Sequence, residues 1–315
     1  MKKETFSQKI KKEILGGLKL LPCCAPAFMS ALLFYSSVTL SSKGAGFEVC
    51  NSNLDLIEKL SSLTQKLYGV EGEIFSQKKG ANEKFCFAAL GEDILYQCGI
   101  LVRDKEGFTQ IARSADKFAL EGECCAKAFL KGCFLMGGSV SVPKAGSAAA
   151  GYHMEFYAHN LPFAQTLEQT LARFFVSFKI TEKKEGYLVY AKESNQISDA
   201  LVLLGASKCM LSMENLKIER SLRNDANRQT NCTMANLDKS VNASAKQLEA
   251  IHSLILKGKM NNLSKGLKEL AELRIEEPDS SMAELAHKLG ISKSGAVHRM
   301  NSLIRLWEEE QKEEQ

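Results

Sequence analysis

Two apolar segments with nearly the same sequence lie 101 residues apart, and they constrain the fold of this chain more than any other feature. Cys23–Leu40 reads CCAPAFMSALLFYSSVTL, and Cys124–Val142 reads CCAKAFLKGCFLMGGSVSV. Five of the first six positions are identical, and an apolar run follows in both. An internal repeat of this length predicts two related subdomains rather than a solenoid, whose units are shorter and more numerous.

Each of the two segments reads as a helix that is apolar almost all round and is therefore buried. Small residues recur four apart, Ala27 and Ala31 in the first segment and Ala128 and Gly132 in the second, so each pair shares one helix face. Small side chains let two helix backbones approach closely. We therefore expect the two helices to pack against each other across a pseudo-two-fold axis, with two unrelated core helices as the alternative.

The repeat continues beyond these helices. Both halves give the order helix–strand–strand–helix–strand–strand–helix, and the copies join near Asp104 to Glu123. This predicts an α+β domain over residues 1–210, with repeats at about 1–104 and 105–210. Within the second copy, the run Ala145–Gly151 has no packing potential and is predicted to be a mobile hairpin tip.

The segment Leu130–Gly138 (LKGCFLMGG) resembles the LAGLIDADG helix of homing endonucleases, which carry two αββαββ repeats around such a helix pair. The resemblance implies an acidic residue at the penultimate motif position of each helix, where the carboxylates hold the metals that cleave DNA. Here those positions are Gly137 and, through the 101-residue offset, Ser36. Because a metal-dependent phosphodiesterase needs hard oxygen ligands, we expect no catalytic residues and no enzyme activity.

The ten cysteines do not follow a zinc-binding spacing, since no C-x-x-C is followed by a second such pair or by spaced histidines. The adjacent pairs Cys23–Cys24 and Cys124–Cys125 diverge by about 100° on a helix. We therefore predict buried free thiols in a reducing cytosol, with no metal and no cofactor. Met1–Leu20 reads as an amphipathic surface helix rather than a signal peptide, which predicts a cytoplasmic protein with no membrane partner.

Composition changes after Gly205. Residues 211–242 are polar and rich in Asn and Arg, so they are predicted to be a connector that cannot bury a core. Arg223 and Arg228 within it are candidate phosphate contacts. A helical pattern then runs from Ala243 to the end, which gives an all-α domain over residues 243–315.

A helix-turn-helix is predicted near the C-terminus. Ser281 and Glu284 form a capping box for the first helix, and Gly290 ends it. The second helix, Lys293–Trp307, turns Ala296, Met300 and Leu303 inward. Its outward face offers the donors expected for phosphates and base edges, namely Ser292, Lys293, Ser294, His298 and Arg299.

The charge distribution fits nucleic-acid binding only in this C-terminal part. The whole chain carries +4, whereas residues 217–307 carry 15 basic and 10 acidic residues. The tail after Trp307 is acidic, with five Glu and one Lys, and it is predicted to be a solvated helix end.

The complete pattern resembles the WhiA family of bacterial sporulation and cell-division transcriptional regulators. The resemblance rests on the two helices that begin with paired cysteines, on RNDANRQTNCTMANLDK (Arg223–Lys239) and on ISKSGAVHR (Ile291–Arg299). It implies sequence-specific binding of double-stranded promoter DNA through the helix-turn-helix, without cleavage. An active endonuclease is the alternative, and a third possibility is that the repeat domain recruits RNA polymerase or another regulator.

Overall fold

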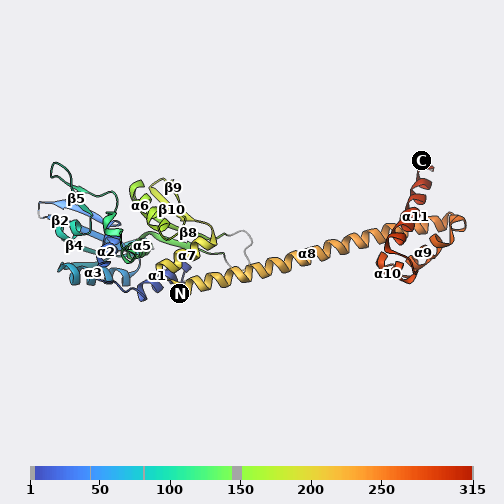
Figure 1. Cartoon of the computed structure of the whole chain (residues 1–315), viewed down its shortest axis with the longest axis horizontal. Helices are drawn as coiled ribbons and strands as arrows, with labels where there is room; N and C mark the ends of the chain where they lie inside the picture. The colour runs from blue at the N-terminus through green and yellow to red at the C-terminus, as the bar shows by residue number, and fades with distance from the viewer. Residues whose placement is uncertain (1–3, 43, 81, 144–150, 314–315) are drawn as a thin grey trace. The chain divides into compact units, whose positions relative to one another are not determined.

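The computed structural model describes residues 4–42, 44–80, 82–143 and 151–313, and it divides into two compact units, residues 1–218 and 219–315 (Figure 1). The predicted hairpin tip Ala145–Gly151 lies almost entirely outside the described residues. Within the described ranges, no helix is long and apolar enough to cross a membrane.

The first unit contains the predicted repeat. Each copy has the order helix–strand–strand–helix–strand–strand–helix, which confirms the predicted α+β fold. The first copy comprises α2 (Ala25–Leu33), β1 (Ser37–Ser41), β2 (Gly44–Asn51), α3 (Leu54–Tyr68), β3 (Gly72–Lys79), β4 (Asn82–Leu90) and α4 (Glu92–Gln97). The second comprises α5 (Glu123–Gly137), β7 (Gly138–Ser141), β8 (His153–Ala158), α6 (Leu161–Ala172), β9 (Lys179–Lys183), β10 (Gly186–Ala191) and α7 (Ser194–Leu204).

The two sheets have the same antiparallel topology, β1-β2-β4-β3 and β7-β8-β10-β9. The junction between the copies holds the hairpin β5 (Leu101–Arg103) and β6 (Thr109–Ile111) and a short 3₁₀ turn, Phe118–Leu120. At the N-terminus the predicted amphipathic helix is α1 (Phe6–Gly16), which buries Ile10 and Ile14 in the shared core.

Helices α2 and α5 lie side by side at the centre of this unit (Figure 1). Gly132 faces Ala31, the residue that the repeat aligns with it. A Cβ added at Gly132 would lie 2.6 Å from the Ala31 Cβ and 3.0 Å from the Phe28 carbonyl oxygen. The close backbone approach predicted from the small residues is therefore confirmed.

The first sheet packs one face on the core and leaves the other open. Phe47, Val49 and Phe87 are buried inward, as the two-residue period of a strand requires. Glu48 and Cys50 alternate with them and point to the open face.

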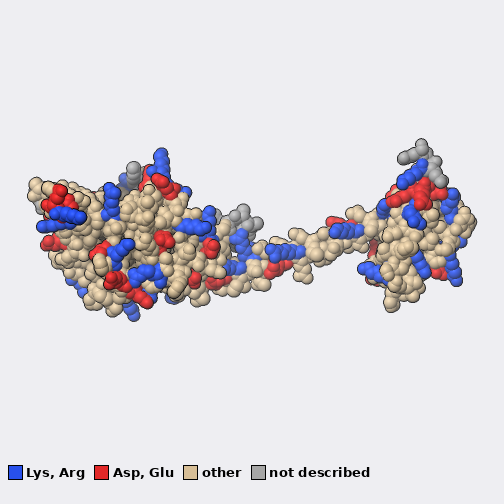
Figure 2. Space-filling view, turned by 45° about the horizontal axis from the view of Figure 1, so that its top comes forward, with Lys and Arg blue, Asp and Glu red and all other residues tan. Residues whose placement is uncertain are grey.

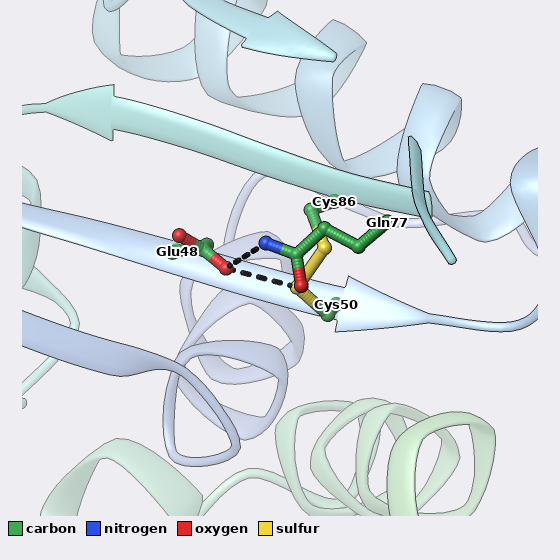
Figure 3. Close-up of a disulfide and its surroundings, with 4 residues drawn as sticks. All are labelled: Glu48, Cys50, Gln77 and Cys86. Atoms are coloured by element: carbon green, nitrogen blue, oxygen red, sulfur yellow. Dashed lines mark hydrogen bonds between the residues drawn. A yellow bond between two sulfur atoms is a disulfide. The ribbon is translucent and has the colours of Figure 1, made fainter. Parts of the chain in front are cut away.

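The cysteine prediction is wrong for one pair, because Cys50 and Cys86 form a disulfide (Figure 3). They occupy opposite positions on β2 and β4, with their Cα atoms 4.1 Å apart. This separation is closer to the roughly 4.5 Å of a non-hydrogen-bonded antiparallel pair than to the roughly 5.5 Å of a hydrogen-bonded one. Glu48 Oε1 lies 3.1 Å from the Cys50 sulfur and accepts a hydrogen bond from the Gln77 amide at 3.2 Å. Cys23 and Cys124 are free but exposed, so the thiols are not uniformly buried either.

The second unit is all helical. It contains the later part of α8 (Ser207–Leu256), a 3₁₀ turn at Lys259–Asn262, α9 (Lys265–Glu276), α10 (Met282–Lys288) and α11 (Lys293–Glu313). Leu270, Leu285 and Met300 are among the residues that form its core.

The polar segment 211–242 is helical throughout as part of α8, so the helical pattern begins well before Ala243. Residues 207–257 contain neither Gly nor Pro, and thus nothing in the segment breaks a helix. Its polarity correctly indicated a lack of core, since residues 221–240 are exposed along their whole length.

Candidate DNA-binding surface

The turn between α10 and α11 is built as the sequence predicts. Ser281 Oγ accepts a hydrogen bond from the Glu284 amide, and the Glu284 carboxylate accepts one from the Ser281 amide. Gly290 then adopts φ +64°, a left-handed conformation that glycine tolerates best. The chain therefore reverses over a few residues and enters α11 in a fixed orientation.

The inward face of α11 fixes this helix against its neighbours. Ala296, Met300 and Leu303 are almost completely buried, and so is Ala286 of α10, the small residue where the two helices meet. A helix fixed along one face holds its opposite face in a defined orientation, which recognition of base edges requires.

The N-terminal end of α11 exposes most of the predicted contact residues. Ser292, Lys293, Ser294 and His298 are all exposed. Ser292 caps the helix by accepting a hydrogen bond from the Gly295 amide at 3.1 Å, and its hydroxyl lies 3.1 Å from that of Ser294. Ser294 and His298 are one helical turn apart and share a face.

Arg299 lies differently from the other candidates. It is half-buried, and its Nη1 lies 3.4 Å from the Gly266 carbonyl oxygen at the start of α9. A Cβ on Gly266 would lie 2.8 Å from the guanidinium carbon, so the missing side chain makes room for the arginine. In this position Arg299 joins α11 to α9.

Two residues that the sequence reasoning missed extend the exposed face of α11. Asn301 and Arg305 follow His298 at spacings of three and seven, and both are exposed. The helical period counted from Ser294 could have found them. Arg305 lies 3.8 Å from Glu309, one turn further along, in an exposed pair of little energetic weight.

Arg223 and Arg228 are exposed on α8 and are not brought next to the exposed face of α11. A helix rises about 1.5 Å per residue, so Arg228 lies roughly 33 Å along α8 from Ala250, where the helix enters the core of the second unit. Arg228 forms an exposed pair with Asp225 at 3.9 Å.

The acidic end of α11 is more than a solvated helix end. Glu308 accepts a hydrogen bond from Lys246 of α8 at 2.7 Å, and Glu310 lies 3.0 Å from Lys259. The acidic residues thus pair with basic residues of the same unit at the end of α11 opposite Lys293.

The two positions that carry carboxylates in LAGLIDADG endonucleases are filled differently here. Ser36 donates its hydroxyl hydrogen to the Leu33 carbonyl at 2.6 Å. Beside Gly137 lies the ring of Tyr35, and a Cβ at Gly137 would lie 2.6 Å from it. Tyr35 donates to the Tyr157 carbonyl at 2.6 Å, and burial raises the pKa of its hydroxyl well above the ordinary value.

The open faces of the two sheets carry a matched pair of glutamates. Glu48 on β2 corresponds to Glu155 on β8, and Glu155 accepts hydrogen bonds from Ser139 at 3.0 Å and pairs with His153 at 2.9 Å. Residues 1–216 carry a net charge of only +3. Figure 2 shows acidic and basic side chains mixed over the visible surface of this unit, without a continuous basic patch.

These features define a class of protein, in which a two-repeat LAGLIDADG-like domain without the acidic motif residues precedes a helix-turn-helix. Comparison with known proteins gives the same result at the level of the family. The model of the WhiA LAGLIDADG-like domain matches residues 126–223, and that of the WhiA C-terminal HTH domain matches residues 226–307.

Similarity to individual proteins extends over almost the whole chain. The "Probable cell division protein WhiA" of Clostridium botulinum strain Eklund 17B is 31% identical over 315 residues, which covers 97% of this chain and 98% of that protein. The protein of that name from Clostridium acetobutylicum is 31% identical over 321 residues and 99% of its length. The chain therefore belongs to the WhiA family.

A solved structure supports the fold. The crystal structure of full-length DUF199/WhiA from Thermatoga maritima superposes with a TM-score of 0.59 at 22% identity, covering 97% of this chain and 99% of that one.

Proposed function

We propose that this protein is a transcriptional regulator that binds specific sequences in double-stranded DNA and does not cleave them. The observation that carries the proposal is that α11 is packed along one face against its neighbours. Its buried face fixes the helix, and its exposed face presents Ser294, His298 and Asn301 together. Such a helix is suited to the major groove, where each base pair offers a distinct pattern of donors and acceptors.

The exposed residues divide into two roles. Lys293 lies in the first turn of α11, where its ammonium group and the free helix amides both favour a phosphate. Ser294, His298 and Asn301 carry neutral hydrogen-bonding groups suited to base edges, and asparagine pairs well with adenine. Ser292 orients the helix as its cap, and Arg299 positions α11 against α9.

Arg223 and Arg228 are assigned a separate electrostatic role. Both are exposed on a continuous helix, so they are available to phosphates independently of the recognition face. Contacts of this kind add affinity that falls with salt and carry no sequence information.

The repeat domain is assigned a protein partner rather than the role of a nuclease. Glu48 and Glu155 place carboxylates on the open sheet faces, where they would repel phosphates, and neither Ser36 nor Gly137 supplies a metal-binding carboxylate. RNA polymerase or another regulator is the proposed partner. The names of the clostridial relatives suggest cell-division genes among the targets, and DNA binding would associate the protein with the nucleoid.

The test uses the full-length chain. Sites enriched by immunoprecipitation define a cognate duplex, and fluorescence anisotropy compares it with a scrambled duplex. His298→Ala should weaken cognate binding selectively, while His252→Ala, which removes an exposed histidine of α8, should leave it unchanged. Equal effects of the two variants would remove the recognition role, and cleavage of the cognate duplex with Mg²⁺ or Mn²⁺ would contradict the non-enzymatic assignment.

A further inference from the structure

Three cysteine thiols from the two repeats converge at one end of the α2–α5 pair. The sulfur of Cys23 lies 3.7 Å from that of Cys124, and Cys124 lies 3.9 Å from Cys125. All three sulfur atoms lie within 4.8 Å of one another. The repeat explains this cluster, because Cys23 and Cys124 are equivalent positions related by the pseudo-two-fold axis.

These separations match the edges of a tetrahedral thiolate site. Zinc binds thiolate sulfur at about 2.3 Å in a tetrahedron, which places neighbouring sulfurs about 3.8 Å apart. A metal ion could therefore be bound with side-chain adjustments alone. Tetrahedral coordination by sulfur favours zinc over Mg²⁺ or Ca²⁺, which prefer oxygen.

Cys24 follows Cys23 in the chain and supplies a further thiol, outside the group of three whose sulfur atoms all lie within 4.8 Å of one another. It is buried, and its sulfur accepts a hydrogen bond from the Leu21 amide at 3.2 Å. An amide donor of this kind stabilises a thiolate. Because it is adjacent to Cys23 at the start of α2, Cys24 is the thiol that we assign as the fourth ligand.

The local electrostatics favour thiolates at this end of the helices. Cys24 is the residue that precedes α2, and Cys124 and Cys125 lie in the first turn of α5, so the positive ends of two helices meet at the cluster. A bound metal ion adds to this effect, since it deprotonates a coordinating thiol outright.

We propose that Cys23, Cys124 and Cys125, with Cys24 as the fourth ligand, bind one Zn²⁺ that clamps the two repeats together. On binding, each of the four thiols releases its proton to solvent and each sulfur donates an electron pair to the metal, leaving a complex of net charge −2. The site lies at the N-terminal ends of α2 and α5, whereas Gly137 lies at the C-terminal end of α5. The clamp is thus separate from the positions Ser36 and Gly137.

Cobalt provides the direct probe. The full-length chain is reduced, stripped of metal with a chelator and titrated with Co²⁺, and Zn²⁺ is then added. We expect one Co²⁺ per chain, with the thiolate-to-cobalt charge-transfer band and the visible bands of a tetrahedral site, all lost when Zn²⁺ displaces it. Zn²⁺ should also raise the Tm of the first unit, because it binds only the folded site.

Single serine variants test the ligands. Loss of an outer-shell group typically weakens metal binding about 10–100-fold, so Cys23→Ser and Cys124→Ser should each weaken it by more than about 100-fold. Cys232→Ser is the matched control, because it removes an exposed cysteine of α8 outside the cluster. The metal-free variants should keep the circular dichroism and Tm of the metal-free wild type, which separates ligand loss from misfolding.

Three outcomes would overturn the proposal. The first is Co²⁺ binding without thiolate bands, and the second is a Cys232→Ser variant as impaired as Cys124→Ser. The third is a Cys23–Cys124 disulfide, found by non-reducing mass spectrometry in freshly purified protein that holds no metal. Unchanged affinity in Cys24→Ser would overturn the assignment of the fourth ligand.

Discussion

Gly132→Ala is the most direct test of the helix pair on which the repeat fold depends. The added methyl group would lie 2.6 Å from the Ala31 Cβ and 3.0 Å from the Phe28 carbonyl oxygen. Neither atom belongs to a flexible side chain, so relief requires the α2 and α5 backbones to separate. Overpacking with backbone shifts costs about 1–3 kcal/mol, and we place this substitution near 3 kcal/mol because both contacts are rigid.

A second effect acts in the opposite direction. Alanine is more favourable than glycine in a helix interior by about 1 kcal/mol, so the net loss of unfolding free energy should be about 2 kcal/mol. For a unit of this size, about 1 kcal/mol corresponds to 2–4 °C, which gives a fall in Tm of about 4–8 °C. The assay is calorimetric or circular-dichroism melting of the full-length chain, in which the two units are expected to give separate transitions.

Two controls isolate the contact. Gly16→Ala adds the same methyl group in α1, where nothing lies within 4 Å, and should leave stability unchanged or slightly increased. Ala31→Gly removes the facing methyl group, so the double variant Ala31→Gly/Gly132→Ala should recover part of the loss, with a coupling energy of at least about 0.5 kcal/mol. If Gly132→Ala is as harmless as Gly16→Ala, or if the two sites are additive, the close helix approach described here is refuted.

Three further predictions concern DNA binding, the disulfide and pH. Lys293→Ala should weaken binding to all duplexes alike and lower the slope of log K against log salt concentration by about one. His298→Ala should reduce the binding free energy by about 1–3 kcal/mol on the cognate duplex only. Fluorescence anisotropy across salt concentrations distinguishes the two effects. Cys50→Ser should lower the unfolding free energy by about 3–4 kcal/mol, which is the loop-closure entropy that a disulfide of 36-residue separation removes from the unfolded chain. An unchanged midpoint in denaturant melts would contradict this expectation. Burial lowers the pKa of Lys11 to about 8, so above that pH the folded state binds fewer protons than the unfolded state. The free energy of unfolding should therefore rise from about pH 8 to 10. Lys11→Met should abolish that rise.

The features that sequence predicted well are those with a local cause. Hydrophobic period and repeat identified both αββαββα copies, because each element must bury one face whatever its neighbours are. The capping box of Ser281 and Glu284 and the left-handed Gly290 fixed the helix-turn-helix, since these motifs depend on residues within a few positions.

The features that sequence missed depend on residues that meet only after folding. The Cys50–Cys86 disulfide follows from the β2–β4 register, which cysteine spacing along the chain does not signal. The repeat predicts that the helices of Cys23 and Cys124 pair, and the folded structure adds that their sulfur atoms lie 3.7 Å apart. Type and helical position predict a DNA contact for Arg299, and they do not signal that its half-buried guanidinium packs against Gly266 of α9.

Tyr35 connects the fold with the proposed absence of cleavage. In a LAGLIDADG nuclease the acidic residue must have open space around it for a metal and the scissile phosphate. Here the ring of Tyr35 fills the space beside Gly137, and its hydroxyl is bound to the Tyr157 carbonyl of the other repeat. An acidic side chain at position 137 would meet this ring rather than a metal ion. Position 137 is therefore part of the packing between the two repeats, and this packing requires no carboxylate there.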